Sequence, residues 1–176
     1  MPLILSGSAG LSGNVGTVTK DMLPAGSVLQ VVQVVKTDVW TNTVVNTWQD
    51  ITGMVASITP MSVASKILVQ VHLNGLGVAA AVAARARLLR DGNLVYAGDA
   101  FSSSARGFSQ NGGPDSAFAA LSIVNFLDSP NTTSAVVYKV QEHQENANAV
   151  FINRTGRDNG TDARLVSSIT LTEIKG

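Results

Sequence analysis

The sequence predicts an all-β protein: a β-sandwich or barrel of about ten short antiparallel strands, preceded by an extended glycine-rich N-terminal arm. Several short segments alternate apolar and polar residues, which is the pattern of half-buried strands. Turn residues separate these segments, and none of them has convincing helical periodicity. The chain has 176 residues, 45% of them hydrophobic, which is enough for the core of one domain.

Residues 1–26 are expected to form the arm, and residues 27–176 the sandwich. Glycine recurs in the arm at every third residue, at positions 7, 10, 13 and 16, so few side chains can be buried there. One interpretation is a three-chain collagen-like twist, and the other is a tether that orders on a neighbouring subunit. For the tether, the candidate anchoring residues are Leu3, Ile4, Leu5, Gly7 and Gly10.

The first half of the domain contains four predicted strands and a hairpin. The predicted strands are Val28–Lys36, Thr43–Ile51, Met54–Thr59 and Lys66–Leu73, with Thr52-Gly53 and Pro60 as breaks. Alternation is clearest in Lys66–Leu73, where Ile67, Val69, Val71 and Leu73 share one face. Asp91-Gly92 between two apolar runs predicts a hairpin of Val82–Arg90 with Leu94–Gly98.

The second half begins with the longest stretch that lacks periodicity, Ala100–Ser116, which is rich in serine and glycine and is expected to be a loop. Further strands are predicted at Phe118–Leu127, Ala135–Gln141, Asn148–Asn153 and Arg164–Ile174. Asp158-Asn159-Gly160 is interpreted as a tight turn, because its glycine is misplaced for a calcium-binding loop.

Composition narrows the possible partners. The 12 basic and 12 acidic residues cancel and form no basic stripe, so nucleic acid is not expected as a partner. Charged residues make up only 14% of the chain, against about a quarter in typical soluble domains. We therefore expect copies of the same chain to cover part of the apolar surface, as a homo-oligomer.

The chain contains no cysteine, which excludes disulfides, thiol chemistry and thiolate metal sites. Leu3-Ile4-Leu5 is too short for a secretory signal, and the apolar run Leu73–Ala84 is shorter than the roughly 18 to 20 residues of a membrane span. The expectation is a soluble protein, made in a cytoplasm without processing.

No catalytic motif is found, and no cofactor is predicted. His143 and Glu145 share one face of a predicted strand while Glu142 lies on the other, so metal binding there is weighed against a solvated strand end. A carboxylate pair for glycoside hydrolysis stays open as a weaker alternative.

The predicted contact surface is the loop Phe101–Ala117. Arg106 and Phe108 offer a guanidinium group and an aromatic ring, which are common at binding hot spots. Trp40, which we expect to be partly exposed, is the third candidate, with Trp48 assigned to the core. The alternative is that these residues only decorate ordinary loops.

Some segments resemble structural proteins of tailed bacteriophages. Leu23–Val32 resembles an opening found in their fibre and virion proteins, as does the pairing of Ser57-Ile58-Thr59-Pro60 with Ser65–Val69. The stretch Ser-Gly-Ser-Ala-Gly-Leu-Ser-Gly at residues 6–13 is similar to their short glycine-rich N-termini. The resemblance implies a virion protein whose arm attaches it to the particle.

From Val28 onward, the pattern also resembles the trimeric jelly rolls of tumour-necrosis-factor-like and complement-like domains. The segments that carry this resemblance are Leu88-Leu89-Arg90-Asp91-Gly92, before the hairpin, and the closing strand Ser167–Ile174. The resemblance implies a jelly-roll-like β-sandwich of about ten short antiparallel strands, which forms a homotrimer with loops gathered at one end.

Together these observations predict a non-enzymatic structural protein on the virion exterior. Its expected partners are its own copies, the major coat protein or another virion subunit, and a host surface glycan or receptor. Capsid decoration, or cement, is the first role, since the sequence shows no shaft. A short tail-fibre knob is the second, and a cellular sugar-binding β-sandwich is the third.

Overall fold

The computed structural model describes residues 19–78, 82–113, 119–145 and 147–176. The candidate anchoring residues Leu3, Ile4, Leu5, Gly7 and Gly10 therefore lie outside the described residues. The described part contains one short 3-10 helix, η1 (Lys20–Met22), followed by strands. The strands are β1 (Val28–Lys36), β2 (Trp40–Asn42), β3 (Gln49–Ile58), β4 (Lys66–Val78), β5 (Val82–Arg90), β6 (Asn93–Tyr96), β7 (Ser109–Gly113), β8 (Ala120–Asp128), β9 (Val136–Gln144), β10 (Val150–Ile152) and β11 (Ser167–Ile174).

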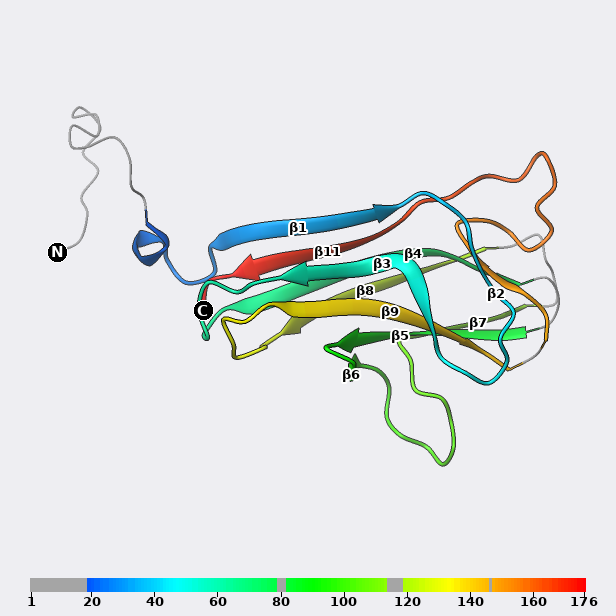
Figure 1. The fold of residues 1–176 in the computed structure, drawn as a ribbon, viewed down its shortest axis with the longest axis horizontal. Coiled ribbons are helices and arrows are strands. Elements are labelled where there is room, and N and C mark those ends of the chain that lie inside the picture. Colours follow the sequence, from blue (N-terminus) through cyan, green and yellow to red (C-terminus); the bar gives the residue numbers. More distant parts are fainter. Residues whose placement is uncertain (1–18, 79–81, 114–118, 146) are drawn as a thin grey trace.

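These strands form two antiparallel sheets that pack as a sandwich (Figure 1). In the first sheet, β11 lies between β1 and β4, and β8 pairs with β4. The short strands β10 and β2 extend this sheet beyond β4. In the second sheet, β9 lies between β3 and β5, and both β6 and β7 pair with β5. The prediction of an all-β, jelly-roll-like sandwich is confirmed.

The core lies between the sheets, where the alternating residues of the sequence place it. Ile67, Val69, Val71 and Leu73 of β4 all have 0% exposure. From the opposite sheet, Val136, Tyr138 and Val140 of β9 belong to the same buried cluster. Because β-branched and aliphatic side chains fill this layer, the low aromatic content does not prevent a closed core.

Among the described strands, β1 and β5 have their predicted bounds and the others differ, three of them for a clear structural reason. β3 runs through Thr52-Gly53 without ending, since Gly53 adopts a φ of +85° inside a register shift that keeps the strand paired with β9. β7 forms within the stretch expected to be a loop, because β5 offers it a pairing edge. β2 precedes the strand expected at Thr43–Ile51, and only the end of that segment belongs to β3.

The residues just before β1 and just after β11 lie side by side at one end of the sandwich (Figure 1). The Gly26 amide donates to the Lys175 carbonyl at 2.7 Å, and the Lys175 amide donates to Ser27 at 2.8 Å. The Lys175 ammonium group also donates to the Leu23 carbonyl. Within the described segments, no helix is long and apolar enough to cross a membrane.

Candidate functional site

The outward side of β1, β11, β4 and β8 carries no charge in the described residues apart from Lys66 at the start of β4. We call this surface the uncharged face. Its members are Val31, Gln33, Val35, Leu68, Gln70, His72, Leu121, Ile123, Asn125, Leu127, Ser168, Thr170 and Thr172. Five of these side chains are large, apolar and more than half exposed: Val31, Val35, Leu121, Ile123 and Leu127. An apolar surface of this kind marks a contact site in a protein.

Strand register arranges the uncharged face in rows. One row aligns Val31, Thr172, Leu68 and Leu127, and the next aligns Gln33, Thr170, Gln70 and Asn125. In the second row, Gln33 donates to Thr170 at 2.9 Å and Gln70 donates to Asn125 at 3.1 Å. A shallow hollow of about 230 Å³ lies over this row, lined by Gln33, Gln70, His72, Ser168 and Thr170. The face is therefore apolar with a neutral polar centre.

The outward side of the other sheet is different, because ion pairs cross it. We call it the charged face; it includes Asp50, Arg85, Arg87, Lys139, Gln141, His143 and Glu145. Lys139 pairs with Asp50 at 2.8 Å, and Arg85 pairs with Glu145 at 2.6 Å. The guanidinium carbon of Arg87 lies 4.1 Å from the centre of the Trp48 ring. Of the two outward sheet surfaces, this one therefore carries the ion pairs.

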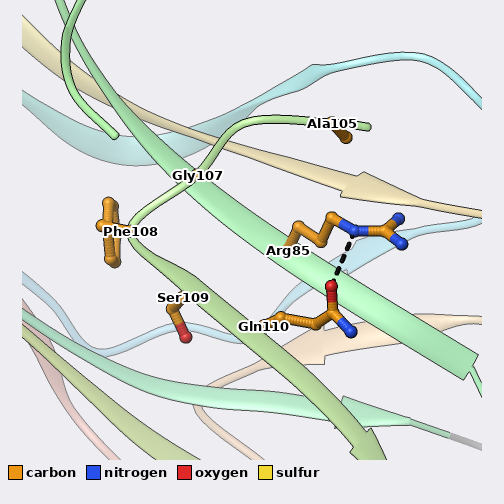
Figure 2. Close-up of a pocket in the computed structure, with 6 residues that line it drawn as sticks. All are labelled: Arg85, Ala105, Gly107, Phe108, Ser109 and Gln110. Carbon is orange, nitrogen blue, oxygen red and sulfur yellow. Dashed lines mark hydrogen bonds between the residues drawn. The ribbon is translucent and has the colours of Figure 1, made fainter. Parts of the chain in front are cut away.

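Two adjoining hollows open between the charged face and the loop that joins β6 to β7. Both include Arg85, Ala105 and Gln110, and we call them together the Arg85 hollow. The larger part, about 390 Å³, is also lined by Asn46, Ser103, Ser104, His143 and Glu145. The smaller part, about 200 Å³, is lined by Gly107, Phe108 and Ser109 as well (Figure 2).

Arg85 is the central residue of this hollow. Its Nε donates to Gln110 Oε1 at 2.9 Å (Figure 2), and its Nη2 donates to Glu145 at 2.6 Å. Its third nitrogen, Nη1, is buried and has no hydrogen-bond partner among the described residues. Gly107 fixes the loop against β5, since a Cβ at this position would lie 2.4 Å from the Ala86 carbonyl oxygen.

The predicted contact residues lie at or near this loop, with one exception. Phe108 lines the smaller part of the hollow, and its ring packs against the core. Arg106 is exposed and donates through Nε to the Gly98 carbonyl at 2.8 Å, so it closes the base of the loop. Trp40 is on β2 in the other sheet and packs partly against the core. The contact role of all three stays a prediction.

The expectation of a solvated strand end at His143 is wrong. His143 is only 9% exposed, and its ring centre lies 5.1 Å from that of Trp48. Burial, and secondarily the charge of Arg85, lower the pKa of His143, so its imidazole is held neutral. Like Arg85 Nη1, its Nδ1 is buried and has no hydrogen-bond partner in the part of the chain that the structure describes. As the alternation predicts, His143 and Glu145 share one side of β9.

Glu142 points the other way, into the sandwich, and is fully buried. One carboxylate oxygen accepts a hydrogen bond from Asn42 Nδ2 at 2.6 Å, and the other finds no partner within residues 19–78, 82–113, 119–145 and 147–176. Burial raises the pKa of Glu142 to about 7, against the Asn42 hydrogen bond, which lowers it. Sequence reasoning missed this group, because alternation gives the direction of a side chain and not its burial.

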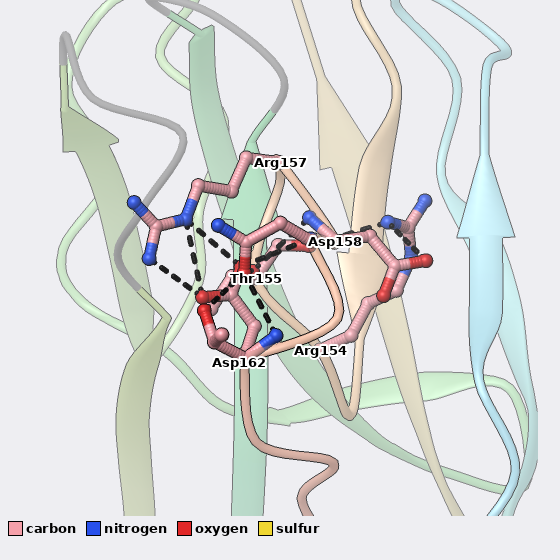
Figure 3. A network of polar contacts seen from close by, with 7 residues as sticks. Arg154, Thr155, Arg157, Asp158 and Asp162 are labelled. Carbon is pink, nitrogen blue, oxygen red and sulfur yellow. Dashed lines mark hydrogen bonds and ion pairs between the residues drawn. The ribbon is translucent and has the colours of Figure 1, made fainter.

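The turn expected at Asp158-Asn159-Gly160 is confirmed, with the Asp162 amide donating to the Asn159 carbonyl at 3.0 Å. Ion pairs hold this loop together (Figure 3). Arg157 pairs with Asp162 at 2.7 Å, and hydrogen bonds from Arg157 and Thr155 hold the pKa of Asp162 well below its usual range. The carboxylates of this loop are therefore paired with arginines of the same chain.

The fold and these surfaces define a class, an antiparallel jelly-roll-like sandwich with one uncharged and one charged face. No protein-family model matches the chain, and no curated protein is significantly similar to it. The function is therefore inferred from the geometry of the two faces.

Proposed function

We propose that this protein is a non-catalytic structural component of a bacteriophage particle. The sandwich assembles as a homotrimer through the uncharged face, and the N-terminal arm attaches it to the virion exterior. Capsid decoration, in contact with the major coat protein, is the first role. The phage assignment is supported by the sequence resemblance alone, and the assembly is supported by the structure.

The composition of the uncharged face is the observation that supports the proposed assembly. Exposed valine, leucine and isoleucine side chains gain free energy when a partner removes them from water, by about 25 cal/mol for each Å² of apolar surface. A partner that brings charges to this surface would lose their hydration without gaining an ion pair. A neutral partner fits best, and three copies around a threefold axis provide one, because one part of the uncharged face of each copy then contacts a different part of that face on the next copy.

The Arg85 hollow favours a second candidate role, a short tail-fibre knob that binds a receptor or glycan of the host surface. The hollow lies on the charged face, so copies packed through the uncharged face would leave it open. The two roles differ in location: labelled antibody would bind the capsid lattice for decoration and the tail for a fibre knob.

Light scattering behind size exclusion tests the assembly. The full chain is expected to have three times its mass of 18.3 kDa. Ile123→Lys places an ammonium group in the middle of the uncharged face, and burying it would cost several kcal/mol in the assembly. We expect this variant to elute with the mass of one chain.

Val137→Lys is the matched control, because Val137 is a partly exposed strand residue of the other sheet. It should keep the assembled mass. A wild-type chain with the mass of a monomer, or an Ile123→Lys variant that stays assembled, would overturn the role of the uncharged face.

A further inference from the structure

We propose that the Arg85 hollow binds one residue of a neutral carbohydrate. This inference deepens the second role proposed above and rests on it. It does not depend on trimer formation, because the hollow and the uncharged face belong to different sheets. With about 390 Å³, the larger part of the hollow falls within the size range of small-ligand sites, about 300 to 1,000 Å³.

The groups that line the hollow match a ligand with many hydroxyl groups. Ser103 and Ser104 supply hydroxyls, and Asn46 and Gln110 supply amides. Each of these groups can both donate and accept hydrogen bonds, as a sugar hydroxyl does. The lining of the larger part is almost entirely polar, with Ala105 as its one apolar side chain among the described residues, and the smaller part adds the Phe108 ring.

The charge balance favours a neutral ligand over an anion. The positive charge of Arg85 is already paired with Glu145, and the lowered pKa of His143 keeps the imidazole uncharged. A sulfate or phosphate would therefore meet one paired cation and a nearby carboxylate. A hydroxyl group meets no such repulsion.

Two polar atoms without partners give the hollow a specific requirement. Arg85 Nη1 is a donor and His143 Nδ1, in one tautomer of the neutral ring, is an acceptor, and both residues line the larger part. A ligand with several hydroxyl groups can accept from the first and donate to the second. Both atoms are shielded from solvent, so a hydroxyl reaches them only after the groups around them shift.

A peptide is a poorer fit for the same place. Extended peptides gain affinity by pairing with a free sheet edge and by filling apolar pockets. The hollow lies over the outward side of β5 and β9, both of which are paired on each edge, and it offers little apolar surface. A sugar ring with several hydroxyl groups therefore fits the hollow better than a peptide does.

Calorimetric and saturation-transfer titrations of the full chain test this proposal. The neutral probes are the methyl glycosides of mannose, galactose, glucose, rhamnose and N-acetylglucosamine, and the anionic probes are sulfate, phosphate and glucuronate. At least one neutral glycoside should saturate the protein. Gln110→Ala removes one amide from the hollow and should weaken that binding about tenfold, as the loss of one good hydrogen bond does.

Glu145→Gln supplies a readout of the mechanism. It frees the charge of Arg85 without changing the shape of the hollow, so glucuronate should gain affinity relative to the neutral sugar. Asp50→Asn is the matched control, since it breaks an ion pair on the same face outside the hollow. It should bind the neutral glycoside as the wild type does.

Three results would overturn the sugar site: no neutral glycoside binds, sulfate or phosphate binds the wild type better than any glycoside, or Gln110→Ala binds unchanged while thermal unfolding shows it folded. The light-scattering mass of the same samples separates this failure from a failure of assembly. A chain with the trimer mass that binds no glycoside would refute the hollow and leave the uncharged face intact.

Discussion

Glu142 is a carboxyl group enclosed by the sandwich, with a single donor to hold it. Asn42 satisfies one oxygen, and the Gln144 amide beside it on β9 donates instead to the carbonyls of Asn42 and Val44. The charged form is therefore poorly solvated, which is why the pKa rises to about 7 from 4.5. Ionisation of Glu142 therefore costs free energy in the folded state and not in the unfolded chain.

We expect the stability of the protein to fall as the pH rises from 4.5 to above 7. The folded state keeps the Glu142 proton over this range while the unfolded chain releases it, so each step up in pH favours unfolding. The full effect is on the order of 3 kcal/mol. Glu142→Gln cannot ionise, so it should be more stable than the wild type at pH 8, with a smaller difference near pH 5, in urea unfolding.

Asp99→Asn is the control for this experiment, because Asp99 lies exposed in the loop before β7. Its substitution removes a carboxylate without changing a buried group and should leave the pH profile unaltered. If the free energies of unfolding of Glu142→Gln and the wild type differ by a constant amount from pH 5 to 8, the carboxyl group is not buried as described.

Gly75 shows how one residue without a side chain shapes β4. Its φ is +125°, and a Cβ added there would lie 2.7 Å from Ile152 Cα and 2.8 Å from the Phe151 carbonyl oxygen. This close approach is what lets β10 pair with the end of β4.

Gly75→Ala should therefore destabilise the protein by about 2 to 4 kcal/mol, through strain and the forced separation of β10. Chemical denaturation with Gly98→Ala as control measures this, because a Cβ at Gly98 would meet open space. Equal midpoints for the two variants would argue against the close contact of β4 with β10.

At the scale of elements, one polar cluster ties the two sheets together. Asp128, at the end of β8, accepts hydrogen bonds from Arg90 of β5 at 2.6 Å and from the Tyr138 hydroxyl of β9 at 2.7 Å. These strands belong to opposite sheets, so the cluster fixes their relative position at that end of the sandwich. A buried carboxylate needs such donors, because its desolvation is costly.

Tyr138→Phe removes one of these donors and keeps the ring in the core. Asp128 would then be held by fewer donors, and we expect a loss of about 1 to 3 kcal/mol in the free energy of unfolding. Tyr96→Phe, on the partly exposed ring that stacks with Phe126, should change stability by less than about 0.5 kcal/mol. A Tyr138→Phe variant as stable as the wild type would show that the hydroxyl does not tie the sheets.

The strands that the sequence predicts best are those whose own residues dictate the pattern. β1 and β5 begin and end where β-branched runs and the Asp-Gly turn place them, and Lys66–Leu73 alternates as predicted. β7 could not be found in this way, because the stretch Ser109–Gly113 has no apolar alternation and becomes a strand only through pairing with β5. The Gly53 bulge in β3 is likewise set by the partner strand.

For the whole molecule, the low charge content predicted a covered surface, and the structure identifies a face on which this shortage is concentrated. The site was less predictable. Composition indicates the loop with Phe108 as a contact surface, but Arg85 has only the pattern of a strand residue. Its contact with Glu145 and Gln110 requires the pairing of β5, β9 and β7. Contacts between strands distant in sequence leave no local signal.

The two ends of the sandwich differ in a way that matters for engineering. Lys175 is bonded to Gly26 and Ser27, whereas the turn at Asn159-Gly160 lies at the opposite end (Figure 1). A peptide fused after Gly176 would emerge beside the root of the arm, toward the surface to which the arm is proposed to attach. A peptide inserted at the Asn159-Gly160 turn would be displayed away from that surface. The same protein can thus carry one peptide that faces the proposed attachment surface and one that faces away from it.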